Sequence, residues 1–444
     1  MFQFTSKAKT LAYILILVGL VSWVAGYFMN NQSHEADGDH HTEQVAAHDG
    51  HEQAVDDHAH GHDAEAGEHD AHSDGVNHEA QQHNRPWAAL LVNSFFWMAI
   101  GLGALFFLAI QYAAQAGWAL GLTRVMEAVA LFMPFPLIVI IVLVVLGQFH
   151  VHHLWHWMDP DLYVVDGPHY DPIIAGKQGF LNIGFFLARA TIYLVGWSAA
   201  AIWLRKNSMK EDEVGGVEHY KKNFRIAVAF LVFYGVTSST SAWDFIMSID
   251  THWFSTLFGW YTFAGVFVTS IAGLIMLTVY LKGQGYMEWI NENHLQDLGK
   301  FMFAFSVFWT YLWFSQFMLI WYSNIPEEVT YYMQRFGEYK LLFFTMVALN
   351  FVLPVLLVMS RDSKRVSGLL VFTGVFVLAG HWLDHYIMIM PGTVGSHYGF
   401  GLLEIGPFLF YFGLYILIVF SNLAKAPLLQ KNHPMITESK LFHQ

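Results

Sequence analysis

Three ionisable residues recur at helical spacing near the end of a long apolar stretch, residues 366–390. His381, Asp384 and His385 are three and four positions apart, so a helix would place them on one face. A carboxylate beside an imidazole changes the pKa of the ring and fixes its tautomer, which suits a site that accepts and releases protons. Glu404, near the start of the next apolar stretch, could join them. The alternative is a structural network of hydrogen bonds between helices.

Two further charges lie inside apolar stretches. Asp244 follows a run of hydroxyl side chains, and Arg189 lies in the stretch before it. Because an unpaired charge in a membrane helix is disfavoured, we expect an ion pair, with a structural and a functional role equally open. Most such residues lie toward one end of the stretches: His150, Arg189, Asp244, Gln316, His381, Asp384, His385 and Glu404.

At the opposite end of the apolar stretches, we expect few ionisable residues besides Glu127. Its carboxylate could pair with Arg124 or reach the surface, which would be a structural role. It could equally serve as a proton-entry group, because an acid near the end of an apolar stretch can exchange protons with water.

These residues need helices that can hold charge in apolar surroundings. Of the 444 residues, 55% are hydrophobic and 13% are charged, whereas a soluble domain carries about 25% charged residues. The sequence therefore predicts an all-α integral membrane protein with about ten transmembrane helices of about 20 or more residues. The ten stretches are residues 10–29, 87–114, 118–148, 180–204, 224–247, 255–281, 301–322, 341–359, 366–390 and 400–423.

Basic residues predict the orientation. The first stretch is too long for the apolar part of a cleaved signal peptide and lacks a good cleavage site, so we expect a membrane anchor. If both termini are cytoplasmic, seventeen Lys and Arg residues lie on that side and four lie outside. Because cytoplasmic loops carry the excess of Lys and Arg, both termini are expected in the cytoplasm.

The segment between the first two stretches is rich in histidine. Residues 30–84 hold twelve of the 25 histidines and fourteen acidic residues, with no Lys or Arg. The segment also has few apolar residues, and burying them cannot offset the conformational entropy lost on folding. We therefore expect a disordered outer loop. Transient binding of Zn²⁺, Cu²⁺ or Ni²⁺ by His58, His60 and His62 is a weaker interpretation, and proton buffering is a third.

Composition also excludes several cofactors and partners. Outside the histidine-rich segment, 22 basic residues balance 21 acidic ones, so no patch suited to nucleic acid is expected. The chain contains no cysteine. It therefore cannot form a disulfide, a thiolate-bound iron–sulfur cluster or a covalently attached c-type haem. Any redox centre must be bound in another way or lie on another subunit.

Four segments resemble a known family. They are SAWDFIMSID (241–250), HWFSTLFGWY (252–261), FWTYLWFSQ (308–316) and WYSNIPEE (321–328). These segments resemble the polysulfide-reductase/NrfD-like membrane subunits of bacterial alternative complex III, and the chain is most similar to the ActF type rather than its ActC paralogue. The resemblance covers nearly all the apolar stretches from the second onward. The motif positions Asp244, Asp250, His252 and Glu327 carry over.

The resemblance implies a fold of two four-helix bundles flanked by the first and last helices. The expected divisions are an anchor helix (1–29), a periplasmic loop (30–86), a first bundle (87–250), a second bundle (251–390), and a last helix with a cytoplasmic tail (391–444). The membrane would be the bacterial inner membrane, so that membrane lipid surrounds the chain.

The resemblance further implies a respiratory role. The complex would oxidise quinol, such as menaquinol, and pass electrons to cytochrome c or another acceptor through iron–sulfur clusters and c-type haems. Those centres would lie on an iron–sulfur subunit and c-type cytochrome subunits, alongside an ActC-like paralogue and a terminal oxidase. This chain would bind no cofactor covalently and would not be catalytic alone.

Two groups of candidates follow for this chain. The quinol-binding candidates are His150 and Gln316. The proton-handling candidates are Glu127, Arg189, Asp244, Asp250, His252, His381, Asp384, His385 and Glu404. The competing interpretations are a divalent-metal transporter, suggested by the histidines, and a purely structural membrane anchor.

Overall fold

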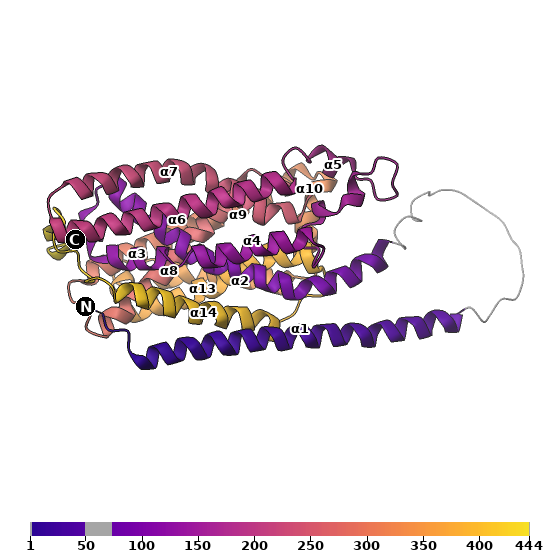
Figure 1. Cartoon of the computed structure of the whole chain (residues 1–444), viewed down its shortest axis with the longest axis horizontal. Coiled ribbons are helices and arrows are strands. Elements are labelled where there is room, and N and C mark those ends of the chain that lie inside the picture. Colours follow the sequence, from indigo (N-terminus) through magenta and orange to yellow (C-terminus); the bar gives the residue numbers. More distant parts are fainter. Residues whose placement is uncertain (1, 49–72, 444) are drawn as a thin grey trace, which may run out of the picture.

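The computed structural model describes residues 2–48 and 73–443, and every regular element in these ranges is a helix (Figure 1). Ten segments there are long and apolar enough to cross a membrane, and they coincide with the ten predicted stretches. The predicted all-α, multi-pass architecture is therefore confirmed. The long helices are α1 (Ser6–His48), α2 (Ser73–Ala113), α4 (Pro134–Gln148), α6 (Ile183–Val214), α7 (Glu218–Phe245), α8 (Leu257–Gly283), α9 (Glu292–Ser323), α13 (Ser367–Val394) and α14 (Leu402–Leu423).

Shorter helices connect or continue the long ones. They are η1 (Gly117–Leu122), α3 (Thr123–Ala130), η2 (His156–Met158), η3 (Pro160–Tyr163), α5 (Pro172–Gly176), η4 (Met247–Ile249), α10 (Pro326–Gly337), α11 (Lys340–Val347), the π-helix η5 (Ala348–Val352), α12 (Leu353–Val358), η6 (Ser363–Arg365) and α15 (Ile436–Lys440).

Both ends of the chain lie at one end of the molecule, which we call the terminal end (Figure 1). The opposite end carries α5 and α10 with the connections around them, residues 149–182 and 324–339, and we call it the loop end. An even number of spans brings the chain back to the end where it began, which explains this placement.

The core lies along α2, α8 and α13, which pack against one another. In α2, 89% of the apolar stretch is buried, compared with 17% in α1. Close approach is possible because Gly103 has no side chain: a Cβ there would lie 2.5 Å from that of Ser270. Helices α2 and α8 thus meet along a close interface.

Helix α1 packs along α14, away from this core. Their backbones meet at glycines, because a Cβ on Gly406 would lie 2.7 Å from the backbone nitrogen of Trp23, and one on Gly413 would lie 2.6 Å from the carbonyl oxygen of Ala12. In a membrane, such small residues permit the close packing that stabilises a helix pair. This contact holds α1 against the bundle.

Two of the predicted spans are interrupted helices. The third consists of η1, α3 and α4, with the break just before Pro134. The eighth contains the π-helix η5 two residues before Pro354. In a helix, the N–H of each residue bonds the carbonyl oxygen four residues earlier. Pro354 lacks this N–H, and its ring would clash with the carbonyl of Asn350. The π-turn accommodates the clash at that point.

The histidine-rich segment differs from the prediction at both of its ends. Helix α1 continues to His48 and α2 begins at Ser73, so those parts are helical rather than irregular. The first proline of the chain is Pro86, so no proline interrupts either helical extension. Residues 49–72, including His58, His60 and His62, lie outside the described part of the chain.

Candidate functional site

A carboxylate buried between three long helices is held by side chains without a permanent charge. Asp384 on α13 is 1% exposed. The Tyr261 hydroxyl from α8 donates to its Oδ1, and Trp309 Nε1 from α9 donates to its Oδ2 at 2.9 Å. His381 Nδ1, one turn earlier on α13, lies 3.4 Å from the same Oδ2. We call these four residues the Asp384 centre.

The Asp384 centre has no fixed positive charge beside it. Among the residues that the structure describes, no Lys or Arg forms an ion pair with Asp384. Burying an ionised carboxylate is costly unless polar groups compensate it. The compensation here comes from two neutral donors, Tyr261 and Trp309, while neither ring nitrogen of His381 forms a hydrogen bond with a described residue. Asp384 is therefore a buried carboxyl group whose hydrogen bonds come only from groups without a permanent charge.

His385 shares the helix face of this centre but makes a different bond. Its Nδ1 donates to the His381 carbonyl oxygen at 2.5 Å, and its ring packs between those of Phe95 and Phe96. Of the three residues predicted to act together, His381 and Asp384 are in contact. His385 is equally buried and contributes to the apolar wall beside them.

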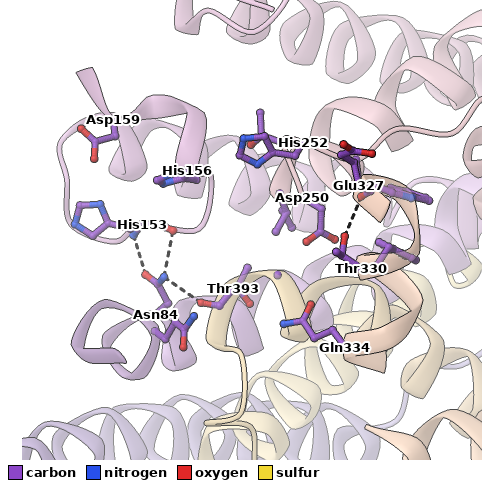
Figure 2. A pocket seen from close by; sticks show the side chains of 16 residues that line it. Asn84, His153, His156, Asp159, Asp250, His252, Glu327, Thr330, Gln334 and Thr393 are labelled. Carbon is purple, nitrogen blue, oxygen red and sulfur yellow. Dashed lines mark hydrogen bonds between the residues drawn. The ribbon is translucent and has the colours of Figure 1, made fainter. Parts of the chain in front are cut away.

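A cavity of about 520 Å³ opens at the loop end (Figure 2). Three carboxylates line it, and no Lys or Arg is among the described lining residues. Asn84 ties its walls together, because the side-chain amide bonds the backbone of His153 and of Thr393. Ten of the lining residues are Asn84, His153, His156, Asp159, Asp250, His252, Glu327, Thr330, Gln334 and Thr393.

Arg335 on α10 connects the cavity to α13. Its Nη2 lies 3.0 Å from Asp250 Oδ2, and its Nε donates to the carbonyl oxygen of Ile387 at 3.1 Å. The guanidinium carbon lies 3.3 Å from the centre of the Tyr331 ring. Arg335 is 1% exposed. Since Ile387 follows Asp384 by less than one turn, the cation fixes the cavity rim to the helix that carries the Asp384 centre.

Tyr331 interacts electrostatically with two carboxylates, Asp250 and Asp384. Its ring stacks on that of Trp253 with centroids 3.8 Å apart. Burial raises the pKa of Tyr331 to about 12; Arg335 opposes this rise, and Asp250 and Asp384 both add to it. Tyr331 is therefore within electrostatic reach of the cavity carboxylate and of the buried one. It remains a neutral hydroxyl at physiological pH.

His252 and its neighbours form the outer rim of the cavity. His252 Nε2 lies 2.5 Å from Asp171 Oδ2. Burial alone would raise the pKa of Asp171, but bonds from the Ile174 N–H and from His252 outweigh it and lower the pKa. Burial lowers the pKa of His156, so this ring is neutral at neutral pH. The cavity wall thus includes a neutral imidazole, His156, and His252, which contacts an ionised acid outside the lining, Asp171.

The predicted ion pair between Arg189 and Asp244 is confirmed. Arg189 donates to both carboxylate oxygens, at 2.7 and 2.9 Å, and the Tyr193 hydroxyl adds a third bond at 2.7 Å. Three aromatic rings flank the guanidinium, the nearest being Phe180 with its centre 3.9 Å away. With every partner in place, this pair fits a structural role better than proton exchange.

Glu404 does not contact the Asp384 centre. Arg85 Nε lies 3.0 Å from its Oε1, and the Gly401 N–H donates to its Oε2 at 2.7 Å. Glu404 therefore caps the start of α14 and is paired with a cation. Its carboxylate satisfies the helix N-terminus, which explains its position at the beginning of that helix.

Glu127 is buried and paired with Arg124, whose Nη1 lies 2.9 Å from its Oε2. The expectation that little else lies near this end is wrong. Helix α6 continues ten residues past the predicted end of its span, to Val214, and turns further charges toward Glu127. The resulting terminal-end cluster consists of Arg124, Glu127, Arg205, Glu211 and Asp212.

The two quinol-binding candidates occupy different environments. His150 is exposed in the turn after α4 and has a positive φ of 56°, whereas Gln316 is buried in α9. Neither of them lines the loop-end cavity. The geometry does not assemble them into one site.

Four residues of the site were missed by sequence reasoning. They are the aromatic residues Tyr261, Trp309 and Tyr331 and the cation Arg335. Aromatic residues are abundant in all the spans, so nothing in the sequence distinguished these three. Arg335 could have been predicted to form an ion pair, because an Arg on a short amphipathic segment close to the membrane needs a partner.

Comparisons with known proteins leave this geometry as the main guide to function. No protein-family model matches the chain, and no curated protein matches it.

Proposed function

We propose that this chain is an ActF-like membrane subunit of a quinol-oxidising respiratory complex, in which it transfers protons while partner subunits carry electrons. The proton role rests on one observation, the buried Asp384 carboxyl that Tyr261 and Trp309 bond and His381 approaches, without a Lys or Arg partner among the described residues. The link to quinol oxidation rests on the resemblance of the segments in residues 241–261 and 308–328 to alternative complex III.

The Tyr261–Asp384 bond can reverse its direction. When Asp384 is ionised, the Tyr261 hydroxyl donates to it. When Asp384 is protonated, its own O–H can donate, and the tyrosine hydrogen is free to turn to another acceptor. Tyr331 and Asp250 continue toward the loop-end cavity, so a proton leaving the centre has polar groups on its way out.

In this proposal, both termini and the terminal end face the cytoplasm, and the loop end faces the periplasm of the bacterial inner membrane. The asymmetry of Lys and Arg supports that orientation. Protons released into the loop-end cavity would then add to the proton gradient. The helices from α2 to α13 would form the two four-helix bundles, with α1 and α14 flanking them.

The electron path belongs to other chains in this proposal. A sequence without cysteine offers no thiolate for iron–sulfur clusters or covalent haem. Quinol, such as menaquinol, would be oxidised beneath an iron–sulfur subunit, next to an ActC-like paralogue. The c-type cytochrome subunits would then pass the electrons onward.

Purification of the tagged chain in mild detergent tests the partnership. We expect iron–sulfur and haem-bearing chains to co-purify, with quinol oxidation by the assembly. A chain that is active without such partners would overturn the respiratory assignment.

Substitution tests the proton role within that assembly. Asp384→Asn should lower quinol oxidation or the proton yield per electron at least several-fold, because the amide cannot exchange a proton. Asp161→Asn, which changes an exposed acid at the same end, is the matched control and should change neither. If Asp384→Asn assembles and retains both values, the chain is a structural anchor only.

A further inference from the structure

Glu211 in the terminal-end cluster is a buried acid without a bonding partner. It is 1% exposed, yet both carboxylate oxygens lack a hydrogen bond from any described residue. The nearby cations are paired with other acids: Arg124 lies 2.9 Å from Glu127 and 2.5 Å from Asp212, and Arg205 lies 3.5 Å from Glu127. Arg124 Nε and Arg205 Nη1 form no hydrogen bond with any described residue. Fully ionised, the cluster would hold three acids and two cations.

Other buried polar atoms near Glu211 are also without partners. They are Asn223 Oδ1, Gln430 Oε1 and His433 Nε2, on side chains that are 0 to 2% exposed. The Tyr112 hydroxyl connects them, because it accepts from Asn223 Nδ2 at 3.3 Å and lies within electrostatic reach of Glu211. Each unsatisfied buried group costs about 1–3 kcal/mol. Buried polar groups without a protein partner are commonly satisfied by ordered water.

A small cavity lies beside two of these groups, Tyr112 and His433. Its volume is about 10 Å³, and its lining includes Tyr112, Thr123, Tyr220 and His433. A polar cavity of about this size holds one water molecule when two to four polar partners are available. His433 Nε2, which has no partner among the described residues, and Tyr112 thus border space for one water molecule, and Glu211 lies within electrostatic reach of Tyr112.

His433 supplies an oriented donor to this cavity. Burial lowers its pKa to about 4, although Asp212 acts in the opposite direction, so the ring is neutral at neutral pH. Its Nδ1 accepts the N–H of Met435 at 3.2 Å. The ring hydrogen is therefore on Nε2, the atom that has no protein partner. This N–H can donate to a water molecule.

The C-terminal segment, residues 424–443, covers the cluster. Gln430 Nε2 donates to Ser208 Oγ at 2.6 Å, and the Lys431 N–H donates to Asp212 Oδ1 at 2.8 Å. Farther along, the Ser439 hydroxyl donates to the Trp118 carbonyl oxygen at 2.9 Å. The cover consists of surface chain, so its local opening requires little disruption of the core.

We propose that Glu211 is a proton-exchanging group that communicates with the aqueous phase at the terminal end through ordered water beneath the C-terminal segment. The ligand is a proton carried by water. A buried carboxylate without a bonding partner, within electrostatic reach of a tyrosine that lines a water-sized cavity, can bind and release one. The proposal concerns the end opposite the Asp384 centre, and it stands whether or not the chain serves a quinol oxidase.

Infrared difference spectra of the full chain in lipid nanodiscs, recorded between acidic and neutral buffer, test the carboxyl group. We expect a protonated-carboxyl band that is lost in Glu211→Gln and kept in Glu213→Gln, the control on an exposed acid two residues away. Glu211→Asp should restore a band at a shifted frequency, which separates loss of the carboxyl from misfolding. No difference between wild type and Glu211→Gln would overturn the proposal.

Transfer to D₂O tests access to water. The Glu211 band should shift on exchange, and it should shift faster in Gln430→Ala, which loses a bond of the cover, than in the Lys440→Ala control. A band that does not shift would show a sealed carboxyl and contradict the proposal. Suppression of the band by sodium but not by choline would show a metal-cation site instead.

Discussion

Arg335 and Asp250 form an ion pair 3.0 Å long at the boundary between the loop-end cavity and the core. The guanidinium side of the pair is 2% exposed and the carboxylate side is 21% exposed. The Arg335 guanidinium is therefore buried in the protein interior, while the Asp250 carboxylate also faces the cavity. This asymmetry makes Arg335 a positioning residue for Asp250 and Tyr331.

Removal of Arg335 should destabilise the chain more than removal of its partner. Arg335→Gln should lower the free energy of unfolding by about 3 kcal/mol, because it also removes bonds to the carbonyls of Ile387 and Tyr331. Asp250→Asn should cost less, since water in the cavity can solvate the amide. The double variant should lose less than the sum of the single variants. Unfolding in mixed micelles measures all three, and strict additivity would rule out the coupling.

Tyr261→Phe should preserve the fold but weaken the Asp384 centre. The ring fits the same space, while Asp384 Oδ1 loses its donor and becomes a partly unsatisfied buried group, at a cost of about 1–3 kcal/mol. The infrared band of the Asp384 carboxyl should shift as well. Tyr13→Phe, on an exposed face of α1, is the control. An unchanged carboxyl band would show that the Tyr261 bond does not influence Asp384.

His152 should make the chain sensitive to acid. Burial lowers its pKa from 6.5 to about 4 in the folded chain. The unfolded chain therefore binds more protons in this range, and stability falls as the pH decreases from about 6.5 toward 4. The loss from this group should reach about 3 kcal/mol at most.

His152→Gln should remove part of this acid sensitivity, because the amide can still donate to the Leu143 carbonyl oxygen but does not titrate. His150→Gln, on an exposed ring, should leave the pH profile unchanged. Unfolding curves across the pH range measure both. The same acid loss in wild type and His152→Gln would contradict the assignment.

Gly406 should be required for the contact between α1 and α14. Gly406→Leu would place a side chain within 3 Å of the Trp23 backbone, which cannot move without separating the helices. We expect a loss of about 3 kcal/mol or more of unfolding free energy. Gly235→Leu on α7 is the matched control, since a Cβ there meets nothing within 4 Å. Equal stability of the two variants would show that α1 is not held by this contact.

The sequence alone predicted ten spans, because a long apolar segment in lipid must satisfy its backbone internally and so becomes a helix. It also predicted the Arg189–Asp244 pair, since each charge needed a partner within the membrane. The contact between His381 and Asp384 was visible from helical spacing. Each of these depends on composition or on positions a few residues apart.

The tertiary structure decided which distant side chains meet. Tyr261 and Trp309 reach Asp384 from helices separated by long stretches of sequence, and Glu404 turns to Arg85 instead. Glu211 joins Glu127 only because α6 continues beyond its apolar segment. Helix periodicity fixes the direction of a side chain on its own helix, but the rotation and depth of neighbouring helices come from packing, at positions such as Gly103 and Gly406 where backbones touch.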